Sequence, residues 1–269
     1  FFQAEAGIRA VERSRGLGDV YKRQHYMNLI LFFYFGSILG SFFQSLNSRM
    51  ASQDSLTESQ LNVRSFRSNC DKCGHQLSVI DLIPILSFLY LKGRCRFCDE
   101  KIEEQNLTAE IIFGFVFLFL SFNSFNTFDL AFNVLFFSFI FAIALYDFEY
   151  FLVPKIYLLF LMLVSCSFVV MHGYLINVIF ASVITGIIFV MKLILDHIKK
   201  EETFGLGDVF VIFCLGLFFD PFSFSLILFL SSFLGLLIFG LRFILLNKEK
   251  KVPFATIMAI GALGISPLG

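Results

Sequence analysis

The sequence has little charge, and this shortage decides its broad class. Only 16% of the residues are Asp, Glu, Lys or Arg, whereas a soluble domain carries roughly 25%. Tryptophan is absent, while 40 phenylalanines and a mean hydropathy of +0.80 reflect long apolar runs. This composition excludes an ordinary soluble enzyme and predicts an all-α polytopic membrane protein. The net charge is zero, and no basic face exists outside short loops between apolar runs, so no nucleic-acid partner is indicated.

The first 26 residues lack the hydrophobic core and the small-residue cleavage site of a signal peptide. They are polar, and the chain turns apolar immediately after Met27. The stretch RGLGDVYKRQ also looks like translated sequencing-adapter sequence fused upstream of a true start at Met27, with a flexible basic tail as the alternative. We therefore predict that residues 1–26 are a non-native or disordered leader.

Apolar windows of about 20 residues predict eight transmembrane helices. Lysine and arginine gather in alternate loops, whereas the loops at 123–127, 172–174 and 219–222 contain none. By the positive-inside rule, the long loop 47–106 is cytoplasmic and both termini lie outside. No internal repeat stands out. The predicted helices lie at 27–46, 107–122, 128–147, 151–171, 174–195, 206–220, 222–246 and 252–268.

The predicted organisation has four parts. A leader (1–26) precedes a first transmembrane helix (27–46), a cytoplasmic four-cysteine domain (47–106) and a transmembrane domain (107–269).

Two C-x-x-C pairs in the cytoplasmic loop predict a structural zinc site formed by Cys70, Cys73, Cys95 and Cys98. The 21 residues between the pairs slightly exceed the commonest spacing of such sites. A disulfide is excluded because the cytosol keeps thiols reduced, and a thioredoxin-like redox pair would need a βαβ setting that is absent. Free buried thiols are the alternative, which suits Cys166 and Cys214 better. The apolar segment 79–91 between the pairs predicts an interfacial helix, or otherwise a core helix of the loop.

Charged residues beside a membrane span are costly, so each needs a reason. Asp129 and Asp220 are expected to face water at outer helix ends, Glu110 to open a helix, and Asp196 to lie in a solvated loop.

Asp147 and Asp208 are both predicted at the cytoplasmic membrane face, where they can meet. Two adjacent carboxylates do not both ionise easily, so one holds a proton while the other stays charged. That arrangement suits an aspartyl protease. Gly205 and Gly207 before Asp208 permit close backbone approach. Because GLGDV also occurs at 16–20, the motif alone is weak evidence, and ordinary helix-end carboxylates are the alternative.

These motifs, taken in order, resemble the bacterial type IV prepilin leader peptidase and N-methyltransferase family. The resemblance runs from about Met27 to the chain end. It rests on the segment GSILGSFFQSLNSR (36–49), the cysteine loop 70–98, Glu110, Asp147 with Pro154, GLGD (205–208), and Pro253-Phe254. The chain departs from the family pattern at Gln44, Lys155 and Phe210.

The resemblance implies an intramembrane aspartic endopeptidase of the bacterial inner membrane, with Asp147 and Asp208 as catalytic residues. It would remove the basic leader of prepilins or pseudopilins and methylate the new N-terminus with S-adenosylmethionine. A glycine-rich nucleotide loop of the Rossmann type is absent, so no residues are assigned to that cofactor.

Two other classes remain open. A proton-coupled transporter would require polar residues within several spans, which are nearly pure Phe, Leu, Ile and Val. A non-catalytic zinc-knuckle scaffold of a pilus or secretion assembly would bind a prepilin without cleaving it.

Overall fold

The computed structural model describes residues 27–51, 68–70, 72–123, 127–200, 202, 204–246 and 252–265. The predicted leader and its GLGDV copy lie outside the described residues, as do several loop residues that the orientation argument used, including Arg64 and Arg67. Within the described part the chain is helical, without a β-strand and with two isolated β-bridges. The prediction of an all-α polytopic membrane protein is confirmed.

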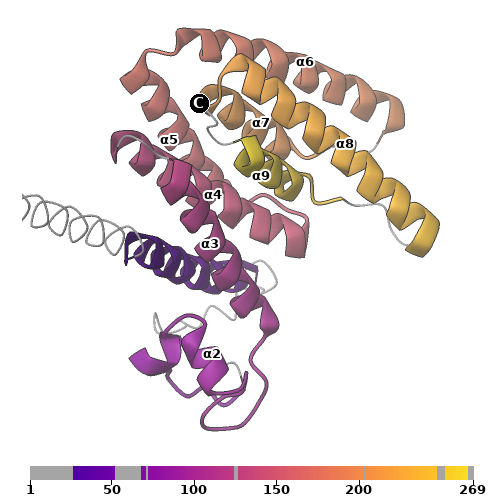
Figure 1. The fold of residues 1–269 in the computed structure, drawn as a ribbon. Helices are drawn as coiled ribbons and strands as arrows, with labels where there is room; N and C mark the ends of the chain where they lie inside the picture. Colours follow the sequence, from indigo (N-terminus) through magenta and orange to yellow (C-terminus); the bar gives the residue numbers. More distant parts are fainter. Residues whose placement is uncertain are drawn as a thin grey trace, which may run out of the picture.

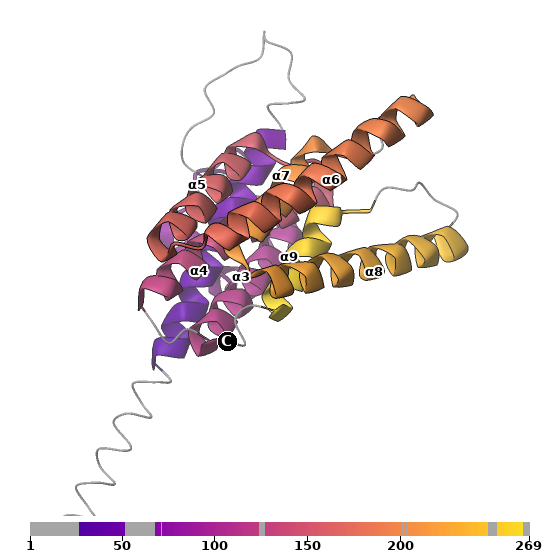
Figure 2. The ribbon, with the colours of Figure 1, turned by 90° about the horizontal axis from the view of Figure 1, so that it is seen from above.

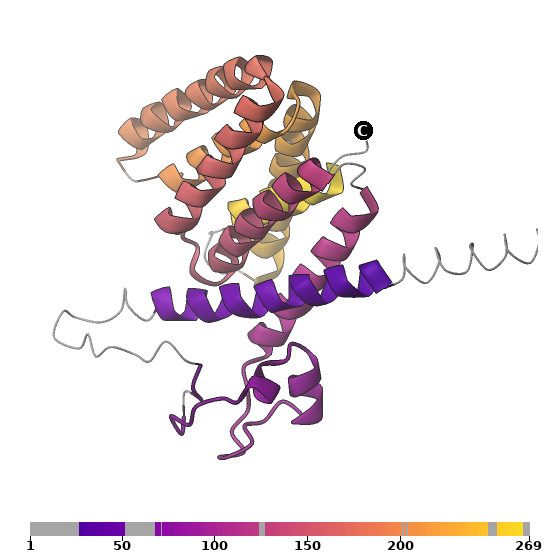
Figure 3. The ribbon, with the colours of Figure 1, turned by 90° about the vertical axis from the view of Figure 1, so that its left-hand side faces the viewer.

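An N-terminal helix, Met27–Ala51, comes first and crosses α3 (Figure 3). The cysteine subdomain, which contains η2 and α2 and ends where α3 begins, follows it. Helices α4 to α9 form a bundle on the opposite side of the N-terminal helix (Figure 1). The elements are the 3₁₀ turn η2 (Val79–Leu82), α2 (Leu86–Tyr90), α3 (Glu104–Asn123), α4 (Thr127–Tyr150), α5 (Lys155–His172), α6 (Leu175–Lys199), α7 (Leu206–Phe218), α8 (Pro221–Leu246) and α9 (Phe254–Ile265).

Apolar helices occur in all eight predicted places, but they differ in length. Six are long and apolar enough to cross a membrane. Helices α7 and α9 have 13 and 12 residues, or about 20 Å and 18 Å at 1.5 Å per residue, against an apolar core of about 30 Å. Both are largely buried against neighbouring helices, α7 against α5 and α6 and α9 against α4 and α8 (Figure 2). Protein rather than lipid therefore surrounds the two short helices.

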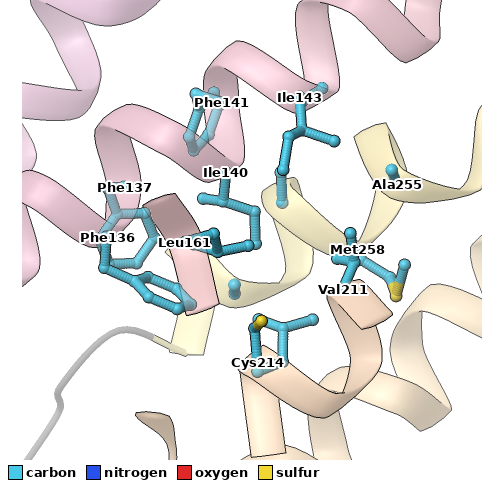
Figure 4. Packing of buried hydrophobic residues seen from close by; sticks show 14 of the residues in the cluster. Phe136, Phe137, Ile140, Phe141, Ile143, Leu161, Val211, Cys214, Ala255 and Met258 are labelled. Carbon is cyan, nitrogen blue, oxygen red and sulfur yellow. The ribbon is translucent and has the colours of Figure 1, made fainter. Parts of the chain in front are cut away.

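Phenylalanine and small aliphatic side chains form the core of the bundle. Phe136, Ile140 and Ile143 from α4 face Leu161 of α5, Val211 and Cys214 of α7, and Ala255 and Met258 of α9 (Figure 4). All of these side chains are buried. This packing fixes the end of α4 relative to the beginnings of α7 and α9.

Two glycines let the N-terminal helix lie directly on α3. A Cβ added at Gly36 would lie 2.4 Å from the carbonyl oxygen of Phe113, and one at Gly40 would lie 2.5 Å from that of Ala109. Four-residue spacing of small residues permits such close backbone contact between membrane helices. The Gly36-x-x-x-Gly40 pattern in the first helix therefore serves helix packing.

Two of the predicted carboxylates, Asp129 and Asp220, lie near helix ends. Asp220 accepts hydrogen bonds from the backbone N–H groups of Phe222 and Ser223 at 3.0 and 3.1 Å and so caps α8. Asp129 does not simply face water, because its Oδ1 lies 2.9 Å from Nε2 of His172. These residues hold helix ends rather than assembling a site.

The expectation that Asp196 lies in a solvated loop is wrong. Asp196 lies within α6, where its carboxylate pairs with Lys192 four residues earlier at 2.5 Å. The helix continues through this polar stretch because an i, i+4 ion pair supports it. Lys192 is itself buried, so the pair belongs to the packed part of the helix.

Candidate active site and cysteine cluster

Asp147 lies near the end of α4 and is nearly buried, with 5% of its surface exposed. Its Oδ2 accepts a hydrogen bond from the backbone N–H of Thr256 at 3.1 Å. The Thr256 hydroxyl lies 3.3 Å from the same oxygen and also donates to the carbonyl of Ala144 at 2.8 Å. Thr256 is the third residue of α9, so Asp147 lies at the positive end of that helix dipole. These donors stabilise the charged form of the carboxylate.

The chain reverses direction immediately after Asp147. Phe151 has a left-handed conformation, with φ of 55°, which residues other than glycine seldom adopt. Its N–H donates to the carbonyl of Asp147 at 2.9 Å and ends α4. The turn brings Val153 against the start of α7, where a Cβ added at Gly207 would lie 2.6 Å from the Val153 Cβ.

Asp208 is the third residue of α7, after the helix cap Gly205. A Cβ added at Gly205 would lie 3.1 Å from Oδ2 of Asp208, so the carboxylate folds back over the beginning of its own helix. Its other oxygen, Oδ1, is buried and has no hydrogen-bond partner among the described residues. Gly207 thus leaves space for Val153, and Gly205 leaves space for the carboxylate of Asp208.

The fold brings Asp147 and Asp208 close enough to interact electrostatically. The two carboxylates differ in their surroundings. Asp147 receives hydrogen-bond donors from α9, whereas one oxygen of Asp208 has none in the described part of the chain. Because hydrogen bonds to the charged form favour ionisation, the pair is asymmetric.

The N-terminal helix adds polar side chains at the same end of α4. Gln44 donates from Nε2 to Oε1 of Glu149 at 2.8 Å. Tyr157 of α5 donates its hydroxyl to Oδ1 of Asn47 at 2.8 Å. Gln44 and Asn47 therefore connect the first helix to the elements on either side of the turn that follows Asp147.

The two cysteine pairs lie in turns that repeat with an offset of 25 residues along the chain. In the first turn, backbone N–H groups donate to backbone carbonyl oxygens: Cys70 to His75, Gly74 to Cys70 and Leu77 to Ser68. In the second turn, the equivalent N–H groups donate to the equivalent carbonyl oxygens: Cys95 to Glu100, Asp99 to Cys95 and Ile102 to Gly93. The isolated bridges Asn69–Gln76 and Arg94–Lys101 match as well. The expectation that the chain has no internal repeat is therefore wrong for this subdomain.

Gly74 and Asp99 occupy equivalent positions in the two turns, directly after the second cysteine of each pair. Both have left-handed backbones, with φ of 68° and 58°. Glycine adopts this conformation without strain, and aspartate is among the residues that tolerate it best. The repeat is hard to recognise in the sequence because these two positions carry different residues.

The four cysteine sulfur atoms all lie within 4.8 Å of one another. Four thiolates about 2.3 Å from a tetrahedral ion stand about 3.8 Å apart, and the sulfur atoms of Cys70 and Cys98 are separated by 3.8 Å. The four cysteines can therefore bind a metal ion, as predicted.

Comparison with known proteins identifies the family. Residues 34–124 match the model of the bacterial Peptidase A24 N-terminal domain, and residues 134–240 match that of the type IV leader peptidase family. The chain belongs to the type IV leader peptidase family.

Several relatives of this leader peptidase family member carry the name prepilin leader peptidase/N-methyltransferase. The protein from Dichelobacter nodosus is 29% identical over 72% of this chain and 68% of its own length. The protein from Bacillus subtilis is 32% identical over 49% of this chain and 50% of its own length. That from Vibrio cholerae is 40% identical over 33% of this chain and 35% of its own length. No solved structure matches the chain.

The two family matches divide the chain differently from our predicted domains. The N-terminal match joins the first helix, the cysteine subdomain and α3, and the second covers both Asp147 and Asp208. Thr256 lies beyond both matched regions. Sequence reasoning identified Pro253-Phe254 nearby, and that pair was the available signal for a contribution from α9.

Proposed function

We propose that this leader peptidase family member is a prepilin peptidase that cleaves with an Asp147–Asp208 dyad at the cytoplasmic membrane face. The observation that carries the proposal is the convergence of the two carboxylates, since α4 and α7 bring them into electrostatic contact. The names of the relatives supply the substrate class, the leader of a type IV prepilin. The lysine and arginine distribution supports an inner-membrane protein with a cytoplasmic cysteine loop.

In the proposed reaction Asp147 is the charged member and Asp208 the protonated member. Asp147 takes a proton from a water molecule, whose oxygen attacks the carbonyl carbon of the scissile peptide bond. Asp208 gives its proton to the carbonyl oxygen, forming a neutral gem-diol intermediate. When the C–N bond breaks, the proton on Asp147 passes to the leaving amine and a gem-diol proton returns to Asp208.

The surroundings of the two carboxylates support these roles. The Thr256 N–H and hydroxyl lie against Asp147 Oδ2, and donors of this kind stabilise a charge. The buried Oδ1 of Asp208 has no partner within the described residues, and burial without a partner favours the neutral acid. Thr256 is therefore proposed as the residue that positions Asp147.

The second proposed activity is methylation of the new N-terminus, usually a phenylalanine, with S-adenosylmethionine as methyl donor. It rests on the names of the relatives and on the family resemblance. No residues of this chain are assigned to the cofactor.

The proposed function is tested with the full chain reconstituted in liposomes and a prepilin substrate. We expect loss of the basic leader, detected by mass spectrometry, and addition of one methyl group to the product when S-adenosylmethionine is supplied. Cleavage without addition of the methyl group would support the proposed peptidase activity and contradict the proposed methyltransferase activity. Binding of the prepilin without cleavage would instead support the non-catalytic scaffold.

The metal of the cysteine cluster is proposed to be zinc in a structural role, since four thiolates suit a closed tetrahedral zinc site. Replacing any one of the four cysteines by serine is expected to abolish stoichiometric zinc binding, measured by metal analysis of the purified chain. Cys166→Ser is the matched control, because this thiol lies in α5 outside the cluster and is exposed, not buried as the sequence suggested. The variant should retain about one zinc ion per chain. Full zinc retention in Cys95→Ser would contradict the assignment.

A further inference from the structure

The segment 79–91 between the two cysteine turns exposes several large apolar side chains. Exposed fractions reach 82% for Val79, 64% for Leu89 and 79% for Tyr90. Ile80, Leu82, Ile83 and Leu86 are exposed as well. Pro84 separates η2 from α2, so the predicted interfacial helix is instead two short turns. A concentrated apolar surface of this kind marks an interaction site.

The single formally charged side chain of this segment, Asp81, is buried and paired. Asp81 has a side chain only 3% exposed and forms an ion pair with Arg96 at 2.7 Å. The Ser78 hydroxyl donates to Asp81 at 2.6 Å and holds the pKa of that carboxyl below its usual value. The charge of Asp81 is thus neutralised by Arg96, whose side chain is 39% exposed beside the apolar residues, and most of the segment's exposed side chains are apolar, which suits an apolar partner.

A hydrogen bond fastens the segment to a membrane-spanning helix. The backbone N–H of Ile85 donates to Oε2 of Glu110 at 2.7 Å, and Ile85 has a left-handed backbone with φ of 63°. Glu110 does not open α3, as the sequence suggested, because the helix begins at Glu104. It is 8% exposed and serves as the acceptor for the subdomain.

This attachment sets the depth of the segment. Glu110 lies six residues into α3, about 9 Å along the helix axis at 1.5 Å per residue. Amphipathic segments at a membrane surface bury their apolar face about 5–10 Å into the boundary between headgroups and acyl chains. Ile85 is therefore held beside the first turns of the apolar span Glu104–Phe122, and the subdomain lies on the side of the N-terminal helix where α3 begins (Figure 3).

We propose that the apolar side chains of segment 79–91 insert into the cytoplasmic leaflet of the bilayer and hold the cysteine subdomain against the membrane. Exposed Lys92 follows the segment directly, and its charge is suited to anionic headgroups. The partner is the lipid surface because the segment is attached to a span that already lies in that surface.

The absence of tryptophan from the chain allows a direct test. Leu89→Trp places a single tryptophan in the segment, and Phe97→Trp places one at an exposed aromatic position on the second cysteine turn. Each full-length variant is reconstituted in vesicles of phosphatidylcholine and phosphatidylglycerol, with or without bromine on the acyl chains. We expect blue-shifted emission and at least about twofold quenching by brominated lipid at position 89, and neither at position 97.

Two results would overturn the proposal. Blue-shifted emission at position 89 without bromine quenching would show that protein, either a second copy or another part of this chain, covers the segment. Equal quenching at both positions would show that the segment is not selectively inserted. Val79→Trp serves as a second reporter, and retention of the bound metal checks that each variant keeps the subdomain folded.

Discussion

Asp147→Asn is expected to reduce prepilin cleavage by about 10²–10⁴-fold or more, because an amide cannot accept the proton of the attacking water. Asp208→Asn is also expected to be severely impaired. However, an asparagine amide can still donate a hydrogen bond to the substrate carbonyl. The Asp208 variant should therefore retain a residual rate at least about tenfold above that of the Asp147 variant.

The asymmetry between these variants tests the proposed roles separately from the proposed function. Initial rates are measured with the full chain in liposomes, and Asp19→Asn in the first GLGDV copy is the matched control that should cleave normally. Wild-type rates in both membrane variants would reject the dyad. A higher residual rate in Asp147→Asn than in Asp208→Asn would be consistent with the proposed peptidase function. It would, however, make Asp208 the base and Asp147 the acid.

The contribution of the Thr256 hydroxyl can be tested separately from that of the Thr256 backbone N–H. Thr256→Val preserves the shape and the N–H but removes the hydroxyl that lies 3.3 Å from Asp147. The single hydroxyl hydrogen is shared between Asp147 and the Ala144 carbonyl at 2.8 Å. Its loss should therefore cost about 0.5–1.5 kcal/mol, and kcat should fall by about two- to tenfold while KM changes little. Thr256→Ser restores the hydroxyl and should restore kcat, which a purely structural role for the methyl group would not explain.

The sequence predicted the apolar helices well and their lengths less well. Hydropathy windows locate 206–220 and 252–268 because both stretches are apolar. They do not reveal that α7 and α9 are enclosed by other helices, since a side chain buried in protein and one facing lipid have the same composition. A helix enclosed by protein need not match the thickness of the bilayer.

The candidate site was predictable where its chemistry lies in local motifs. The spacing of the cysteines and the G-x-G-D pattern predicted which residues to examine. The contact between Thr256 and Asp147 joins residues 109 positions apart, and threonine within an apolar run carries no signal of its own. Similarly, the hydrogen bond from Ile85 to Glu110 uses a backbone donor, which leaves no mark on the side-chain pattern.

Gly207→Ala is expected to lower cleavage by about 100-fold, because a reacting group displaced by about 1 Å can lose that much rate. The new Cβ would lie 2.6 Å from the Cβ of Val153, so the start of α7 and the turn after Asp147 must separate. Overpacking of this kind costs about 1–3 kcal/mol and leaves most proteins folded. Zinc content and extraction as a single species in detergent would show that the variant is intact.

Other glycines provide a graded comparison for the Gly207 variant. A Cβ at Gly205 would lie 3.1 Å from the Asp208 carboxylate, a tight contact with a side chain, whereas one at Gly186 in α6 meets nothing within 4 Å. Cleavage should therefore fall most in Gly207→Ala, less in Gly205→Ala and not at all in Gly186→Ala, whose helix alanine stabilises by about 0.5–1 kcal/mol. Equal activity of the Gly207 and Gly186 variants would mean that the contact with Val153 does not hold the two aspartates together, and the geometry proposed for the dyad would then be wrong.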